Sequence, residues 1–408
     1  MKKIIIFLII FSAVISLSAK ERTGWGWGGV PALNYNADDG FGYGVLMDLF
    51  NYKEGGYDPY YLKIKPIIFF TTGGKQDHTF FVDSPYLLGR GWRFNFRIRF
   101  KQENYYPFYG FGNDSHFDPD FIKTDDNDNP LDPIYGKHYY TFQSTQIKCI
   151  VNFQKALIKR DNGKPKYSLL IGGGIADNSN EYNDNDDIKT KVEQFVDRGE
   201  IGQKEFKGYL NSYIKAGLIY DTRDNEPAPN RGCWSSLLIE GYSKIIGSET
   251  NFARITLTDR RYFTLMNNLV FANRVIYEKL MGDVPFSMLY PFGGSVRADE
   301  GVGGYRTIRG QLKNRYLGTE KAFMNLELRY KFYDFMFANQ DFYLAASVFY
   351  DVGRVWHEDD DTGGLKNLKD GKGVGLHIGW NENFIVYAEM GFGHEVGGQL
   401  YIDVGYLF

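Results

Sequence analysis

Polar and apolar residues alternate along much of this chain. Between Trp92 and Phe100, every even-numbered residue is apolar and every odd-numbered residue is polar or cationic. The alternation recurs in 325–332 and again in the last segment, Leu400 to Phe408. A period of two gives a β-strand one apolar face and one polar face. The pattern therefore predicts strands along the whole chain, with no break that would divide it into domains.

About sixteen such segments can be counted from the amino terminus. They are 23–35, 41–51, 60–72, 79–84, 92–102, 139–154, 167–176, 209–222, 233–242, 252–263, 269–277, 322–333, 342–353, 373–380, 384–392 and 399–408. The odd-numbered connections include the long ones, 104–138, 177–208, 278–321 and 354–372, and the even-numbered ones are mostly short. Transmembrane barrels have long extracellular loops and short periplasmic turns, whereas a β-sandwich has no reason to sort its loops. We therefore predict an all-β fold, a transmembrane antiparallel β-barrel of about sixteen strands.

The composition agrees with a barrel. The chain has 31 Tyr, 33 Phe and 47 Gly, and its formal net charge is only −3. An Arg or Lys that faced lipid would cost roughly 2–4 kcal/mol at the midplane, so the charged strand faces are expected to line the lumen.

The amino terminus predicts export. Lys2 and Lys3 precede the apolar run 4–17, and the small residues Ser18 and Ala19 offer a cleavage site. This order is typical of a secretory signal peptide. A signal anchor is the alternative, but the charged residues 20–22 follow at once. We predict a signal peptide over 1–19, a barrel domain over 20–408, and location in an outer membrane of the Gram-negative type.

No stretch of the sequence predicts catalysis. The six histidines lack the spacing of metal ligands, and the two cysteines, Cys149 and Cys233, are too few and too far apart to form a disulfide framework. No G-x-S-x-G motif is present. We expect no catalytic residue, metal or cofactor, although an active site assembled from distant strands remains an alternative.

The segment 303–311 is unusually rich in Gly, Arg and aromatic residues for a turn. We predict that this part of the long connection 278–321 folds back into the barrel, where Arg309 meets carboxylates from the strands. The alternative is a solvated loop that contacts nothing. Strand alternation favours the first interpretation, because Glu327 and Asp351 fall on the inward faces of their strands.

The motifs on this loop and on the strands after it resemble those of the BamA/TamA superfamily of outer-membrane assembly and translocation barrels. Ile308, Arg309, Gly310 and Gln311 resemble its Val-Arg-Gly-aromatic loop motif, with Gln311 departing from the usual aromatic. The resemblance implies a loop that enters the lumen.

Two strand motifs extend the resemblance. Phe349, Asp351 and Gly353 are similar to the Phe-x-Asp-x-Gly motif, whose Asp receives the loop arginine, and Glu327 stands at the place of a second carboxylate. The stretch 217–225 resembles the family's strand ending in Tyr-Asp-Thr-Arg. The matches follow the family's order over the whole mature chain.

The final strand is similar to the β-signal that hands barrels to the resident barrel-assembly machinery. The residues of this predicted signal are Gln399, Tyr401, Gly405, Tyr406 and Phe408. Alternation places Tyr406 and Phe408 on the apolar face with Leu400, Ile402 and Val404. A last lipid-facing strand without a signalling role is the alternative.

The first strand contains residues that weaken a β-ladder. They are Gly24, Gly26, Gly28, Gly29 and Pro31. Barrel closure pairs this strand with the last one, and the resemblance implies that their seam is a lateral gate. The alternative is that the glycines let Trp25 and Trp27 sit in an interfacial girdle.

The resemblance implies insertion or translocation of protein, or of lipid, at the outer membrane through this lateral seam. A passive pore or structural barrel, whose Arg-rich lumen would favour anions, is the alternative. The first strand begins within a few residues of the predicted cleavage site, which predicts a barrel without polypeptide-transport-associated domains. Expected partners are outer-membrane lipid, lipopolysaccharide, the barrel-assembly machinery, client proteins and a separate periplasmic partner; no nucleic acid is expected.

Overall fold

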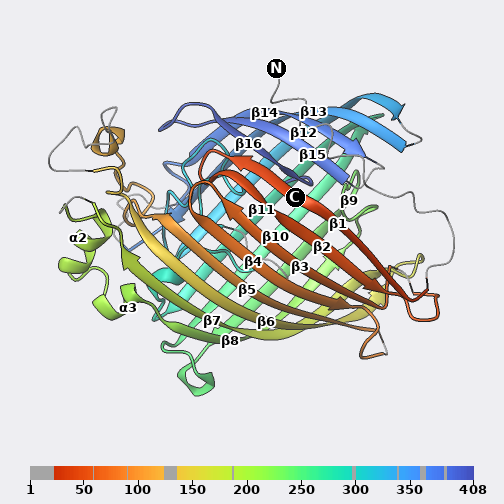
Figure 1. Cartoon of the computed structure of the whole chain (residues 1–408), viewed down its shortest axis with the longest axis horizontal. Helices are drawn as coiled ribbons and strands as arrows, with labels where there is room; N and C mark the ends of the chain where they lie inside the picture. The colour runs from red at the N-terminus through yellow and green to blue at the C-terminus, as the bar shows by residue number, and fades with distance from the viewer. Residues whose placement is uncertain are drawn as a thin grey trace.

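A computed structural model describes residues 23–57, 59–89, 91–123, 136–185, 188–295, 300–337, 340–358, 364–380 and 384–408. The predicted signal peptide, residues 1–19, lies outside them. Sixteen antiparallel strands form a closed barrel in which each strand pairs with its sequence neighbours and β1 pairs with β16 (Figure 1). The predicted fold class and strand number are confirmed.

The strands run in chain order around the barrel. They are β1 (Trp25–Asn36), β2 (Gly40–Asn51), β3 (Leu62–Thr71), β4 (Lys75–Ser84), β5 (Trp92–Pro107), β6 (Thr141–Lys159), β7 (Pro165–Tyr182), β8 (Leu210–Asp221), β9 (Gly232–Tyr242), β10 (Phe252–Met266), β11 (Leu269–Gly282), β12 (Glu320–Phe337), β13 (Gln340–Trp356), β14 (Lys369–Trp380), β15 (Phe384–Phe392) and β16 (Gln399–Val404). The helical elements are η2 (Pro119–Ile122), α2 (Lys191–Asp197), α3 (Gln203–Lys207), η3 (Lys244–Ile246) and η4 (Phe286–Met288).

The long connections lie together at one end of the barrel. They follow β5, β7, β11 and β13, and the connection between β7 and β8 carries α2 and α3 at the left of Figure 1. In an antiparallel barrel, all odd-numbered connections meet at the same end. The long connections therefore lie at one end of the barrel, as the sequence predicted.

Three strands are longer than predicted. β5, β6 and β7 extend several residues beyond their predicted ends, towards the connections that they join.

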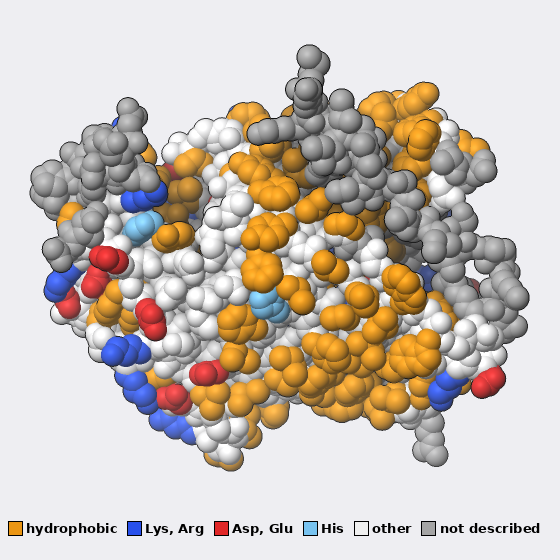
Figure 2. Space-filling model, viewed as in Figure 1, with side chains coloured by type: hydrophobic (Ala, Val, Ile, Leu, Met, Phe, Trp, Pro, Cys, Tyr) orange, Lys and Arg blue, Asp and Glu red, His pale blue; other side chains and the backbone are white. Residues whose placement is uncertain are grey.

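The barrel wall has an apolar outer face and a polar inner face. On β12, Leu328 and Tyr330 are 38% and 51% exposed, whereas Glu327 and Arg329 are buried. Hydrophobic side chains cover much of the wall in Figure 2, and the charged side chains on this face gather towards the two ends of the barrel. No helix within the described ranges is long and apolar enough to span a membrane.

Candidate functional site: the inner loop and the barrel seam

The connection between β11 and β12, residues 283–319, is called here the inner loop. Ile308, Val302 and Tyr316 of this loop are buried in a cluster with apolar side chains that include Phe323 of β12 and Val355 of β13. Large apolar side chains stabilise a loop in this position by roughly 1.5–3 kcal/mol each, since they are removed from water. This packing brings the tip of the loop against the inner faces of the strands.

Arg309 is fully buried and binds three carboxylates. Its Nε and Nη2 donate to the two oxygens of Asp351 at 2.8 and 2.9 Å. Its Nη1 donates to Glu327 Oε2 at 3.3 Å and to Glu389 Oε2 at 2.9 Å. The guanidinium also lies 3.5 Å from the ring centroid of Phe349. A planar guanidinium is suited to this arrangement, because its fork can bind one carboxylate with two parallel hydrogen bonds and still donate to others.

Strand order brings these partners together. Glu327 pairs with Phe349 across β12 and β13, and Asp351 lies two positions further along the same face. Burial alone would lower the pKa of Arg309, but Asp351 and Glu389 raise it well above its ordinary value. Sequence reasoning identified Glu327 and Asp351 but missed Glu389, which has no motif around it. Alternation was the available signal, since exposed Ala388 precedes this buried acid on β15.

Close backbone contacts require glycine around the arginine. Gly310 has φ +91°, and a Cβ there would lie 2.5 Å from the carbonyl carbon of Phe392. A Cβ at Gly353 would lie 2.6 Å from the carbonyl oxygen of Ala322. Sequence reasoning missed Gly371, where a Cβ would lie 1.9 Å from the Arg309 carbonyl oxygen. Real Cβ atoms do not approach so closely, so glycine at Gly310 and Gly371 lets the loop reach the wall, and glycine at Gly353 lets β13 lie against β12.

Gln311 replaces the aromatic that the resembling family usually has at this position. Its Nε2 donates to the backbone carbonyl of Asp370 at 2.6 Å, and its side chain is buried. Tyr316 donates its hydroxyl to Gln311 Oε1 at 3.4 Å. The loop tip therefore uses polar contacts to the start of β14.

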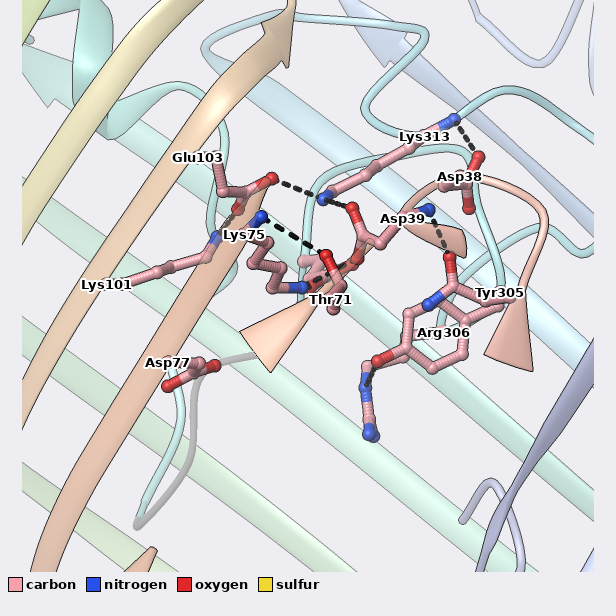
Figure 3. A network of polar contacts seen from close by, with 12 residues as sticks. Asp38, Asp39, Thr71, Lys75, Asp77, Lys101, Glu103, Tyr305, Arg306 and Lys313 are labelled. Carbon is pink, nitrogen blue, oxygen red and sulfur yellow. Dashed lines mark hydrogen bonds and ion pairs between the residues drawn. The ribbon is translucent and has the colours of Figure 1, made fainter. Parts of the chain in front are cut away.

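Lys313 attaches the inner loop to the opposite side of the seam, and sequence reasoning missed it. Its Nζ donates to Asp39 Oδ1 at 2.6 Å and to Glu103 Oε2 at 2.5 Å (Figure 3). Lys75 binds the other oxygen of Asp39 at 2.8 Å. Asp39 lies in the turn between β1 and β2, and Glu103 lies on β5. The inner loop is thus bound to β13 and β15 through Arg309, and to the amino-terminal strands through Lys313.

The two acids of the β1–β2 turn differ in their electrostatics. Burial raises the pKa of Asp39, but Lys313 and Lys75 outweigh this effect and hold it well below its ordinary value. Burial, together with the charge of Asp39, raises the pKa of Asp38 from 3.8 to about 7. Asp38 Oδ1 accepts the backbone N–H of Lys313 at 3.2 Å, whereas its Oδ2 is buried without a hydrogen bond.

This difference predicts a pH dependence. Because the pKa of Asp38 is higher in the folded chain, its stabilising contribution is complete below pH 3.8 and is lost as the pH rises to about 7. Asp38→Asn removes the titration and keeps an acceptor for Lys313. We expect the variant to be more stable than the parent at pH 8 by roughly 1–3 kcal/mol, with the difference shrinking towards pH 4. Urea unfolding in detergent micelles at both pH values measures this difference, and a constant difference would contradict the prediction.

The seam between β1 and β16 is short. These strands pair only at Tyr35 with Ile402 and Asn36 with Tyr401, although both are described throughout. In contrast, β1 pairs with β2 along its whole length, from Trp25 to Asn36.

The predicted glycine-rich seam requires a correction. Gly26, Gly28, Gly29 and Pro31 pair with β2, and Gly24 precedes β1, so none of them pairs with β16. If the observed register continued, Val404 would face Leu33, and the glycines would lie beyond the end of β16. Trp25 and Trp27 are 63% and 77% exposed on the outer face, as a girdle requires.

The end of the chain follows the predicted alternation as far as Val404 and departs from it afterwards. Gln399 and Tyr401 face inward, and the Tyr401 hydroxyl accepts the Gly310 N–H at 3.0 Å. β16 ends at Val404, since Gly405 takes φ +93° and turns the chain out of the strand.

The last residues then lie against inward side chains. The Tyr406 ring lies 3.9 Å from the guanidinium of Arg329, and the Phe408 carbonyl accepts a hydrogen bond from Arg329 at 3.2 Å. Phe408 is buried beside Tyr262 and Ala272 of β10 and β11. The expected lipid-facing position of Tyr406 and Phe408 is therefore wrong.

One group among the described residues has donor atoms close enough for a metal ion. Glu327, His377 and Glu389 each offer one such atom, and these lie within 4.8 Å of one another. Both carboxylates already bind Arg309, and Glu327 also binds Arg329 at 2.8 Å. The positive charge of the two guanidinium groups opposes a metal ion, so these carboxylates fit the arginines better.

Comparison with known proteins decides the family. The model of the Omp85 superfamily domain matches residues 72–386, well over half of the chain. The chain belongs to the Omp85 superfamily. A search of curated proteins gave no match.

Solved structures of Omp85-type barrels share the fold. BamA from Haemophilus ducreyi lacking POTRA domains 1–3 superposes with a TM-score of 0.59 and 13% identity, over 94% of this chain and 71% of that one. CdiB from Escherichia coli superposes with a TM-score of 0.56 and 11% identity, over 96% of this chain and 64% of that one. The present chain is thus a β-barrel of the Omp85 superfamily that spans less than two thirds of the CdiB chain.

Proposed function

We propose that this Omp85 barrel, located in the outer membrane, inserts or translocates protein, or lipid, through a lateral opening between β1 and β16. The short seam carries this proposal. β1 and β16 pair at two positions, so few backbone hydrogen bonds oppose their separation. An unpaired strand edge is a template for a strand of another chain, and β1 offers such an edge along 25–34.

The contacts of the inner loop support control of this opening. Arg306 binds Asp403 of β16 at 3.2 Å, and Gly310 donates to Tyr401 of the same strand. Lys313 binds the β1–β2 turn at Asp39. The loop therefore contacts both sides of the seam, and its release would lower the cost of opening. In this proposal, the protein has no catalytic role and receives clients from a separate periplasmic partner.

A crosslink across the seam tests the proposal. Tyr35 and Ile402 face each other in register, so cysteines at both positions can join β1 to β16 after the free cysteines Cys149 and Cys233 are replaced by serine. Liposomes that contain the protein should accelerate the folding of a small outer-membrane barrel added as a client. We expect oxidation of the Tyr35→Cys, Ile402→Cys variant to reduce this acceleration at least about tenfold, and reduction to restore it.

A matched crosslink on the other edge of β16 serves as the control. Ala388 of β15 faces the same Ile402, so a bond between cysteines at these positions leaves the seam free. This control should keep full activity when oxidised. Full activity of the oxidised seam crosslink would contradict a lateral opening.

A passive pore is the alternative function, and conductance distinguishes it. An open pore should pass an anion-biased current in planar bilayers whether or not the seam is crosslinked. A current that is unaffected by the crosslink, together with no effect on client folding, would favour the pore.

A further inference from the structure

A second polar region of the lumen lies between β5, β6 and the inner loop, and its lining does not include Arg309. It encloses a cavity of about 100 Å³. The cationic residues that line it are Arg97, Arg99, Lys101, Lys148 and Arg306, and the acidic ones are Glu103 and Glu300. These five cations and two carboxylates leave a net charge of +3 on the described lining.

Ion pairs with two acids outside the lining offset two of these three positive charges. Arg99 binds Asp77 at 2.7 Å, and Arg306 binds Asp403 at 3.2 Å. Lys148 differs, because within the described part of the chain it has no hydrogen bond and no carboxylate at ion-pair distance. Its Nζ lies 5.8 Å from the centroid of the Tyr213 ring.

The strand register adds an unfavourable pair. Lys148 of β6 lies directly opposite Arg99 of β5, and both side chains line the cavity. Like charges directly opposite each other destabilise a sheet. An anion held between the two side chains would turn this repulsion into attraction. Arg97 and Lys101 each lie two positions from Arg99 on the same face of β5, and they extend the positive field on either side of it.

We propose that this cavity is a binding site for a phosphate-type oxyanion. Lys148 and Arg99 would supply the charge-assisted hydrogen bonds, and the Gln146 and Asn178 side chains, which line the same cavity, would supply neutral donors. The volume is enough for several water molecules or one tetrahedral oxyanion. The site rests on the lumen geometry alone and is independent of the lateral opening.

The test measures stabilisation of the purified barrel in a maltoside detergent free of phosphate. Inorganic phosphate should raise the unfolding temperature more than sodium chloride of equal ionic strength, because a ligand that binds only the folded state stabilises it. In Lys148→Met, phosphate affinity should fall at least about tenfold. Without phosphate, this variant should be as stable as the parent or more so, since the repulsion with Arg99 is gone.

Lys164→Gln removes the same charge from the turn between β6 and β7, outside the cavity lining, and should leave the phosphate effect intact. A second arm replaces inorganic phosphate with detergent-solubilised phosphatidylglycerol. A Lys148-dependent shift with phosphate supports a free anion as the source, and such a shift with the lipid alone supports a headgroup. An equal shift with chloride, or no dependence on Lys148 in either arm, would overturn the proposal.

Discussion

Replacing Arg309 by alanine is expected to lower the free energy of unfolding of the barrel by about 3–5 kcal/mol. The substitution removes the cation that Asp351, Glu327 and Glu389 all bind, while the three carboxylates stay buried. Uncompensated charges in a dry interior are far more costly than the loss of an exposed ion pair. Urea unfolding in micelles and heat-modifiability on gels both measure this change.

Two further substitutions make this prediction specific. Arg309→Lys keeps the charge but cannot bind Asp351 through a planar fork, so its stability should lie between those of the parent and the alanine variant. Arg261→Ala removes an arginine whose side chain is 57% exposed and bound to Asp259, and should cost less than about 1 kcal/mol. Similar small losses for Arg309→Ala and Arg261→Ala would show that the buried cluster does not hold the loop.

Replacing Lys313 by methionine is expected to have the second largest effect. It leaves Glu103 and Asp39 without their shared cation, although Lys75 still binds Asp39. Burial alone would lower the pKa of Lys313, but Asp39 and Glu103 raise it well above its ordinary value, so the charge is present at neutral pH. We expect a loss of about 2–4 kcal/mol and faster amide hydrogen exchange along β1. Lys279→Met, which removes an exposed ion pair with Glu320, is the matched control.

The double variant of Arg309 and Lys313 tests whether the inner loop acts as one unit across the seam. If the attachment through Arg309 and the attachment through Lys313 depend on each other, the double variant should lose less free energy of unfolding than the two single variants together. The difference should be about 1 kcal/mol or more. Additive losses within about 0.5 kcal/mol would show two independent attachments. That outcome would contradict control of the seam by the loop and leave the oxyanion site unaffected.

Much of the architecture could be predicted because it depends on local alternation. All sixteen strands were located, and Glu327 and Asp351 were placed on the inner face by parity alone. The predicted ends of the strands were less accurate, because backbone pairing continues past the stretch in which polar and apolar residues alternate. β6, for example, continues to Lys159, five residues beyond its predicted end.

The contacts that were missed join residues far apart in sequence. Glu389 is 80 residues from Arg309, and Asp39 is 274 residues from Lys313. No local pattern marks such pairs, because they depend on how a closed barrel brings distant strands around one loop. The wrong placement of Phe408 has a local cause, a single left-handed glycine at 405 that ends the alternation.

By itself, the sequence predicted a barrel of about sixteen strands, placed the polar faces of its alternating strands towards the lumen, and predicted that Arg309 meets two inward acids. Only the tertiary structure decided that a third acid completes this cluster, that Lys313 attaches the loop across the seam, and that β1 and β16 pair at two positions. The physical reason is that alternation encodes the environment of each side chain, whereas register and loop docking follow from closure of the whole sheet.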